Sequence, residues 1–90
     1  MLYGGLRSKT IELTIDHVAL RVFGLYIAEG NIRSDKRTIQ FTFGRHEEHY
    51  ADLIKDWASN IGINTHTIFG PGTRVVYLFS KALADWLVDN

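Results

Sequence analysis

The chain has 90 residues, enough for one small domain and too few for two lobes with a cleft between them. Its ten basic and ten acidic side chains cancel, so overall charge does not indicate nucleic acid or membrane as a partner. The lack of cysteine excludes a disulfide framework, and no apolar run is long enough to span a bilayer. We therefore expect one globular domain of a cytoplasmic, intracellular protein without a membrane partner; a nucleoid-associated or organellar setting also fits.

Residues 1–13 have no clean hydrophobic period, so an irregular lead-in is expected there, within a single domain over 1–90. Asp16 is a suitable N-cap for an apolar segment that runs to Gly30, which predicts a helix over 16–29 ended by a left-handed glycine. Segments 31–34 and 37–43 flank a polar connection. Apolar and polar residues alternate in the second segment, as in a two-stranded hairpin.

Apolar side chains recur at helical spacing from about residue 47 to 61, which predicts a second, amphipathic helix. Residues 63–69 and 73–79 surround a Gly-Pro-Gly turn and are expected to form another hairpin. Ser80 is expected to cap a short third helix. The predicted order is αββαββα, and the fold class is α+β, with a four-stranded antiparallel sheet packed under helices.

The first helix is apolar nearly all round, because Arg21 is the only charged residue between Val18 and Ala28. Gly24 and Ala28 lie four apart on one face, a spacing that lets two helix backbones approach closely. A second copy of the helix would fill that face, so we favour a homodimer. The alternative is a monomer in which the helix is buried and Gly24 passes under an aromatic ring.

Glu29 lies in the last turn of this helix, where the helix dipole disfavours an acid. If two copies pack through the helix, two carboxylates converge, and at about 6 Å they repel by about 3 kcal/mol at an effective dielectric constant of about 20. A hard divalent cation such as Mg²⁺ would neutralise them and carry water able to attack a phosphate ester. The simpler alternative is a solvated surface glutamate.

Lys81 follows the Ser80 cap and also opposes its helix dipole, so either a phosphate or bulk water could accompany it. The predicted hairpins carry amide, hydroxyl, imidazole and guanidinium groups of the kind that read base edges in a DNA major groove. If Ile32, Ile39, Phe41, Ile63 and Phe69 face the helices, the outward set is Asn31, Arg33, Thr38, Gln40, Thr42, Asn64, His66 and Arg74. The same alternation puts Val76 and Leu78 beside Arg74, with Ile68 also outward, which makes the face less polar, and an ordinary solvated sheet remains the alternative.

The segment His46-Glu-Glu-His49 is similar to a metalloprotease motif, but its histidines are three apart rather than four and no third ligand is evident. Its glutamates more simply complement the positive end of the second helix. We therefore do not expect zinc there.

Residues 22–30, VFGLYIAEG, resemble the LAGLIDADG signature in the L-Y-x-A-E-G variant of intein-type homing endonucleases. The element order agrees, and the similarity extends from Asp16 over nearly the whole chain, including the N-I-G-I segment at 60–63. The resemblance implies signature helices packed at a two-fold or pseudo-two-fold interface, with Val22, Gly24, Leu25 and Ala28 in it. It also implies paired saddle-shaped sheets in the DNA major groove.

By the same resemblance, Glu29 and Gly30 would bind Mg²⁺ or Mn²⁺, and Glu29 would be catalytic. Lys81 occupies a place similar to that of a lysine that supports the scissile phosphate or the attacking water. His46 is the counterpart of a polar residue after the second strand that supports catalysis in some members. Only one motif copy is present, so an active form needs a homodimer or a second repeat from elsewhere.

The leading hypothesis is a homodimeric, metal-dependent, site-specific endonuclease that hydrolyses phosphodiester bonds of double-stranded DNA. A two-fold symmetric dimer would bind a DNA site whose two halves are nearly palindromic. A second hypothesis is a non-catalytic DNA-binding module on the same scaffold. A third is a dimerisation or protein-interaction domain whose sheet face meets protein.

Overall fold

The structure is a computed structural model that describes residues 15–89; the lead-in expected over 1–13 lies outside this range. A four-stranded antiparallel sheet and three helices form the fold, in the predicted αββαββα order with one added 3₁₀ turn. The elements are α1 (His17–Glu29), β1 (Gly30–Ile32), β2 (Thr38–Gly44), η1 (Arg45–Glu47), α2 (Glu48–Asn60), β3 (Asn64–Gly70), β4 (Thr73–Phe79) and α3 (Lys81–Asp89). The α+β class is confirmed.

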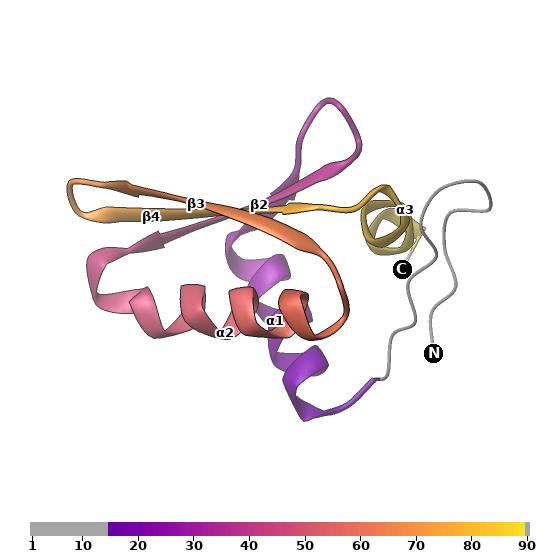
Figure 1. The fold of residues 1–90 in the computed structure, drawn as a ribbon, viewed down its shortest axis with the longest axis horizontal. Helices are drawn as coiled ribbons and strands as arrows, with labels where there is room; N and C mark the ends of the chain where they lie inside the picture. The colour runs from indigo at the N-terminus through magenta and orange to yellow at the C-terminus, as the bar shows by residue number, and fades with distance from the viewer. Residues whose placement is uncertain (1–14, 90) are drawn as a thin grey trace.

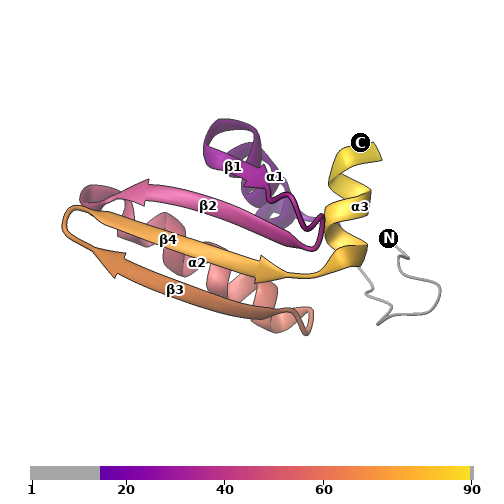
Figure 2. The ribbon, with the colours of Figure 1, turned by 90° about the horizontal axis from the view of Figure 1, so that it is seen from above.

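The helices cover one face of the sheet and leave the other open. Figure 1 shows α1 and α2 beneath the strands and α3 at one end, while the loop between β1 and β2 rises from the opposite face. Figure 2 shows the strand order β1-β2-β4-β3, with α2 crossing under β4 and β3. The side of the sheet away from α1 and α2 is called the open face below.

The helix boundaries follow from local capping. Asp16 accepts a hydrogen bond from the Ala19 backbone N–H at 2.9 Å, which confirms the predicted cap of α1. The Ser80 hydroxyl accepts one from the Leu83 N–H at 3.1 Å and caps α3 in the same way. The turn between β3 and β4 is Pro71-Gly72, and Gly72 has a φ of 75°, a conformation that glycine adopts without a steric penalty.

The expectation that a left-handed glycine ends α1 is wrong. Gly30 has φ −101° and ψ 157°, so it is extended and begins β1, while its N–H donates to the Tyr26 carbonyl. A Cβ atom at Gly30 would lie 2.6 Å from Tyr26 Cδ1. The position therefore needs glycine for close approach rather than for a positive φ.

The core lies between the sheet and the helices. Ile39, Phe41 and Phe43 from β2 and Val76 and Leu78 from β4 are fully buried beneath the strands. The helices fill the other side of the core with Ala19, Val22, Ala51, Ile54, Trp57, Ala58, Ala82, Leu83 and Ala84. Aromatic contacts join the helices: the Phe23 ring centroid lies 4.9 Å from that of Trp86 in α3 and 6.2 Å from that of Trp57 in α2.

Candidate nucleic-acid interface

The open face is defined by the strand register. Asn31 in β1 lies opposite Gln40 in β2, and Gln40 lies opposite Tyr77 in β4. Tyr77 in turn lies opposite His66 in β3, so one row of side chains crosses all four strands on the face away from the core. The open face carries Asn31, Arg33, Thr38, Gln40, Thr42, Asn64, His66, Ile68, Thr73, Val75, Tyr77 and Phe79.

Seven of the eight side chains predicted to contact DNA lie on this open face, and Arg74 does not. Arg74 pairs with Phe69 on the helix-facing side of β4, where its Nε lies 3.4 Å from Glu48 Oε1 of α2. Its guanidinium lies 5.0 Å from the centre of the Phe69 ring. The expected outward position of Arg74 is therefore corrected: alternation sets it on the same side as Val76 and Leu78, and both of these are buried.

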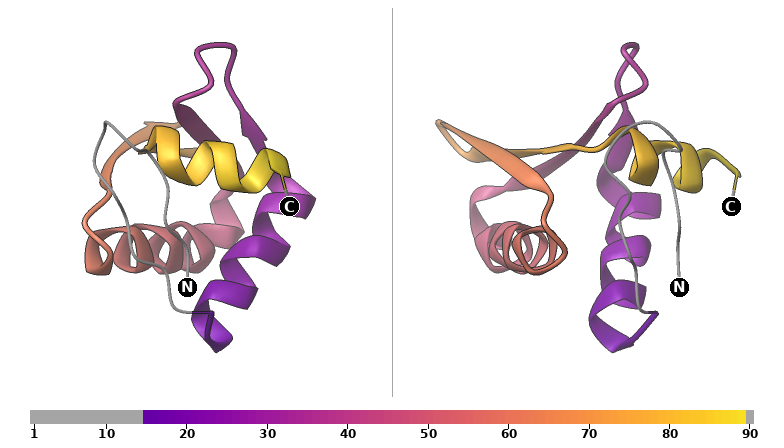
Figure 3. Two further views of the ribbon diagram at one scale, coloured as in Figure 1. Left: turned by 90° about the vertical axis from the view of Figure 1, so that its right-hand side faces the viewer. Right: turned by 45° about the vertical axis from the view of Figure 1, so that its right-hand side comes forward.

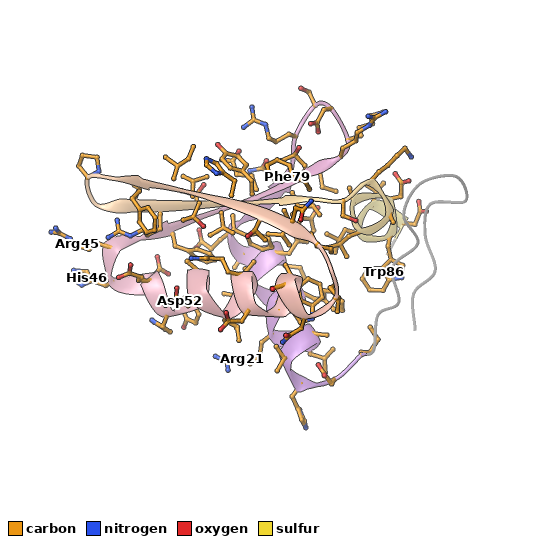
Figure 4. All side chains as sticks on the ribbon, viewed as in Figure 1. Arg21, Arg45, His46, Asp52, Phe79 and Trp86 are labelled. Atoms are coloured by element: carbon orange, nitrogen blue, oxygen red, sulfur yellow. The ribbon has the colours of Figure 1, made fainter. Side chains whose placement is uncertain are left out.

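Because the inward and outward rows of β4 are exchanged relative to the expectation, residues that were not expected there lie on the open face. Val75, Tyr77 and Phe79 occupy the central strand, and Figure 4 shows Phe79 above the sheet. The rings of His66, Tyr77 and Phe79 form a row with successive centroids 6.4 Å apart. The sequence held no clear signal for them, because both rows of β4 contain apolar residues and the alternation fits either row facing inward.

Thr38 is on the open side of β2 but is buried, with 6% of its surface exposed. Its hydroxyl donates to Asp35 Oδ2 at 2.8 Å, so it is already used within the β1–β2 loop. The prediction that Thr38 contacts a DNA base is therefore corrected. Its hydroxyl has a structural role, because it binds Asp35 within the β1–β2 loop.

Asp35 organises the loop between β1 and β2. It accepts hydrogen bonds from the N–H of Arg37 at 2.9 Å and of Thr38 at 3.0 Å, in addition to the Thr38 hydroxyl. The Arg37 N–H bond, followed by the Thr38 hydroxyl, holds the pKa of Asp35 below its ordinary value of 3.8. Lys36 takes up the left-handed conformation, with φ 59°, and its N–H donates to the Arg33 carbonyl at 2.9 Å. The loop therefore has one defined shape.

Charge is unevenly distributed even though the chain is neutral. The β1–β2 loop brings cations to the open side, with one acid among them: Arg33, Lys36, Arg37 and Asp35. The exposed acids of α2 lie on the other side of the sheet: Glu48, Asp52 and Asp56. Figure 4 shows Asp52 below α2, away from the strands. The three cations of this loop would therefore attract an anion to this end of the open face.

The two small residues predicted to lie at a dimer interface, Gly24 and Ala28, are on the surface of α1. Gly24 and Ala28 are exposed, and a Cβ atom at Gly24 would meet nothing within 4 Å. The expectation, within the monomer alternative, that Gly24 passes under an aromatic ring is therefore wrong. Leu20 and Ile27 flank the small residues and are 57% and 84% exposed. Figure 3 shows α1 as the outermost helix on one side of the fold.

Two residues predicted for that interface are placed differently. Val22 is 2% exposed and packs in the core of its own chain, so it is corrected to a core residue. Leu25 is half-buried and packs against the same core. The apolar surface instead continues beside Ile27 into a shallow pocket of about 180 Å³ between α1 and α3, lined by Phe23, Tyr26, Ile27, Trp86 and Leu87.

The candidate catalytic residues lie at three separate places in one chain. Glu29 is exposed at the end of α1, next to Gly30, which pairs with Phe41 near the middle of β2. Lys81 follows the end of β4 that lies against Thr38, whereas His46 follows Gly44 at the other end of β2. At about 3.3 Å per residue, these two ends of β2 are about 20 Å apart. Figure 4 shows His46 at the far end from α3.

His46 and Lys81 therefore lie at opposite ends of β2 within one chain. Lys81 also has a local partner, because its Nζ lies 2.7 Å from Asp85 Oδ2, one helical turn along α3. A carboxylate thus accompanies Lys81, where a phosphate or water was expected. Within residues 15–89, no group of three or more His, Asp or Glu side chains is arranged to hold a metal ion.

Comparison with known proteins gives distant relatives only. No protein-family model matches the chain, and no solved structure matches it. An uncharacterized protein of Methanocaldococcus jannaschii, MJ1054, is 31% identical over 87 residues, which cover 87% of this chain and 10% of that protein. A probable cell division protein WhiA from each of two Clostridium botulinum strains, Eklund 17B and Alaska E43, is 27% identical over 71 residues.

The chain spans about a tenth of the length of MJ1054, and the match covers 22% of each WhiA protein. The similarity therefore concerns one segment of much longer proteins. None of the described helices is long and apolar enough to cross a membrane.

Proposed function

We propose that two copies of this domain form a site-specific endonuclease that cleaves double-stranded DNA with Mg²⁺ or Mn²⁺. The observation that carries the proposal is the combination of an unpaired apolar face on α1, ending at Glu29, with an open sheet face rich in hydrogen-bonding side chains. The LAGLIDADG-like segment at 22–30 covers this same helix and Glu29. One surface would join the copies, and the other would contact the DNA.

The α1 face supports self-association because its exposed apolar side chains lie on one continuous face, and such patches often mark interaction sites. Leu20 and Ile27 flank Gly24 and Ala28, which lack bulk and would let a second α1 approach closely. Such a pairing would bring two Glu29 carboxylates to one axis. A small domain also gains stability from a partner, since it buries a modest share of its surface alone.

The Glu29 carboxylates of both copies, with the Gly30 carbonyls beside them, are the groups that would hold the cations. Oxygen ligands suit Mg²⁺, and a bound cation would supply an activated water and stabilise the leaving oxygen. Glu29 is exposed at the end of α1, so its carboxylate is accessible to a metal and to DNA phosphates. Lys81, already paired with Asp85, is exposed and could exchange that partner for phosphate.

The test is cleavage of a randomised duplex library with Mg²⁺, followed by sequencing of the new ends. Near-palindromic cut sites that disappear in EDTA would support the proposal. Glu29→Gln should abolish cleavage and keep DNA binding, because it removes the charge that attracts the cation while leaving the side-chain shape. Asp52→Asn is the matched control, since Asp52 is an exposed acid on the helix side and should have no effect. If the wild-type protein is a folded dimer and the duplex library stays uncut, the proposed cleavage is contradicted.

A second candidate function is a DNA-binding module without nuclease activity. The separation of Glu29, His46 and Lys81 in one chain favours it, because a cleaving site depends on contributions that a single copy does not bring together. Under this function Glu29→Gln and the wild type bind DNA equally, and neither yields a metal-dependent product. The same cleavage experiment therefore separates the two candidates.

A further inference from the structure

We propose that Arg33 reads a guanine in the bound DNA, and that Gln40 and Tyr77 hold its guanidinium in position for that contact. This inference rests on the DNA binding proposed above, and it does not depend on cleavage. It assigns one specificity-determining residue and two positioning residues among the side chains of the open face.

The guanidinium of Arg33 makes two contacts, a hydrogen bond along its edge and an aromatic ring against its face. Its Nη1 donates to Gln40 Oε1 at 3.1 Å, and its Cζ lies 5.5 Å from the centre of the Tyr77 ring. An aromatic ring beneath a guanidinium attracts it through the negative charge of the ring face. These two contacts restrain the plane and the direction of a side chain that would otherwise sample many rotamers.

Gln40 is itself oriented by a further contact. Its Nε2 donates to Thr42 Oγ1 at 3.3 Å while its Oε1 accepts from Arg33. Each polar atom of the Gln40 amide thus makes one contact within the open face, and together these contacts orient the amide oxygen toward Arg33. Gln40 is therefore better suited to position Arg33 than to bind adenine with both amide atoms, the contact that a glutamine on such a face would otherwise make.

The backbone of Arg33 is fixed as well. Its N–H donates to the Thr38 carbonyl at 2.9 Å, and its carbonyl accepts from the Lys36 N–H at 2.9 Å. Asp35 closes the loop through its bonds to Arg37 and Thr38. The Arg33 side chain therefore starts from a hydrogen-bonded position in the β1–β2 hairpin and extends over Tyr77 in β4.

Guanine is the ligand that this arrangement fits. An arginine side chain has five donor hydrogens, and Gln40 occupies one, which leaves donors for the paired acceptors O6 and N7 on the major-groove edge of guanine. Adenine offers N7 but places a donor amino group where guanine has O6, so it would oppose the guanidinium. Arg33 and Arg37 both belong to the β1–β2 loop, but the guanidinium of Arg33 lies over Tyr77 in the central row of the open face, where base edges rather than backbone phosphates would be nearest.

The experiment is selection of binding sites from a random duplex library without divalent metal, so that cleavage does not interfere. Wild type should enrich a guanine at a fixed position in each half-site. Arg33→Ala should lose that preference and bind the selected site on the order of 10- to 100-fold more weakly, with other positions unchanged. Circular dichroism and thermal melting establish that each variant is folded.

Arg37→Ala is the matched control, because it removes an exposed cation from the same hairpin. It should weaken binding to all sequences by a similar factor and leave base preferences unaltered, as expected for a phosphate contact. An equal loss on all sequences for Arg33→Ala would overturn the inference and make Arg33 a phosphate contact. Loss of guanine preference in Arg37→Ala but not in Arg33→Ala would overturn it too.

The positioning residues have their own readout. Gln40→Ala and Tyr77→Leu should reduce the guanine preference several-fold while affinity for non-selected DNA stays the same. Gln40→Glu should retain the preference, because its carboxylate still accepts from Arg33. A wild-type protein that enriches no DNA would overturn both this inference and the proposed function; a protein that selects guanine but never cleaves would support this inference and overturn the nuclease.

Discussion

Gly30 packs so closely against Tyr26 that a Cβ atom on Gly30 would lie 2.6 Å from Tyr26 Cδ1 and 2.9 Å from the Tyr26 Cα and carbonyl oxygen. This contact is made where the chain leaves α1 and enters β1. It sets the direction in which Glu29 ends the helix and Asn31 enters the sheet. Because Gly30 has no side chain, the chain can pass directly from α1, which carries the apolar surface, into β1, which carries part of the open face.

Gly30→Ala should lower the free energy of unfolding by about 1–3 kcal/mol, since the added methyl group overlaps backbone atoms of Tyr26 that cannot move away freely. Urea denaturation followed by circular dichroism measures the change. A midpoint within error of wild type would show that the α1–β1 junction can relax.

Ile27→Glu should convert the proposed dimer into a monomer. Ile27 is 84% exposed beside Gly24 and Ala28, so a charge there costs an isolated chain little but would be buried between two copies. Light scattering gives the mass of wild type and variant. Val88→Glu is the control, because Val88 is 70% exposed on α3 and should leave the dimer intact. A wild-type mass equal to that of one chain would contradict the dimer directly.

Gly24→Ala and Gly24→Leu should separate the effect of this position on folding from its effect on association. Alanine raises helix propensity by about 1 kcal/mol and meets no atom within 4 Å, so it should stabilise a single chain. Leucine should also be tolerated by one chain but should weaken dimerisation by holding the two helices apart. Denaturation of dilute protein and the dimer dissociation constant measure the two effects separately. Unchanged dimerisation in Gly24→Leu would place the interface elsewhere.

Asp35→Asn should lower stability above pH 4 and lose its effect in acid. The hydrogen bonds from Arg37 and Thr38 depress the pKa of Asp35 in the folded state below 3.8. A depressed folded pKa contributes stability above the unfolded pKa, and this contribution is lost as pH falls through the folded pKa. Thermal melting from pH 7 to pH 2 should therefore show the two curves converging below about pH 4.

Arg74→Met should leave DNA affinity and its salt dependence unchanged. Arg74 lies on the helix side with Glu48 and Phe69, so it adds no contact to the open face. Loss of its ion pair with Glu48 and of its hydrogen bonds to the Gly70 and Thr73 carbonyls should lower the free energy of unfolding by about 1–2 kcal/mol. Binding isotherms at several salt concentrations test this; a shallower salt slope would return Arg74 to the DNA interface.

Residue patterns along the chain were sufficient to predict the number, order and approximate bounds of the elements. Asp16 and Ser80 cap helices because their side chains accept from the backbone three residues later, and this chemistry is local. The alternation of Ile39, Phe41 and Phe43 likewise identified the inward face of β2. The apolar surface of α1 was also evident from the sequence, since one charge in eleven residues is unusual for a helix with a solvated side.

Tertiary structure alone decided the phase of β4 and the partners of its side chains. Both rows of that central strand are apolar, so alternation does not tell which row is buried; pairing with β2 and β3 puts Val76 and Leu78 inward and turns Arg74 toward Glu48. Tertiary structure also separated His46 from Lys81 and brought Arg33 over Tyr77. Such relationships join residues distant in sequence, and they depend on strand register, which a local pattern of side chains does not contain.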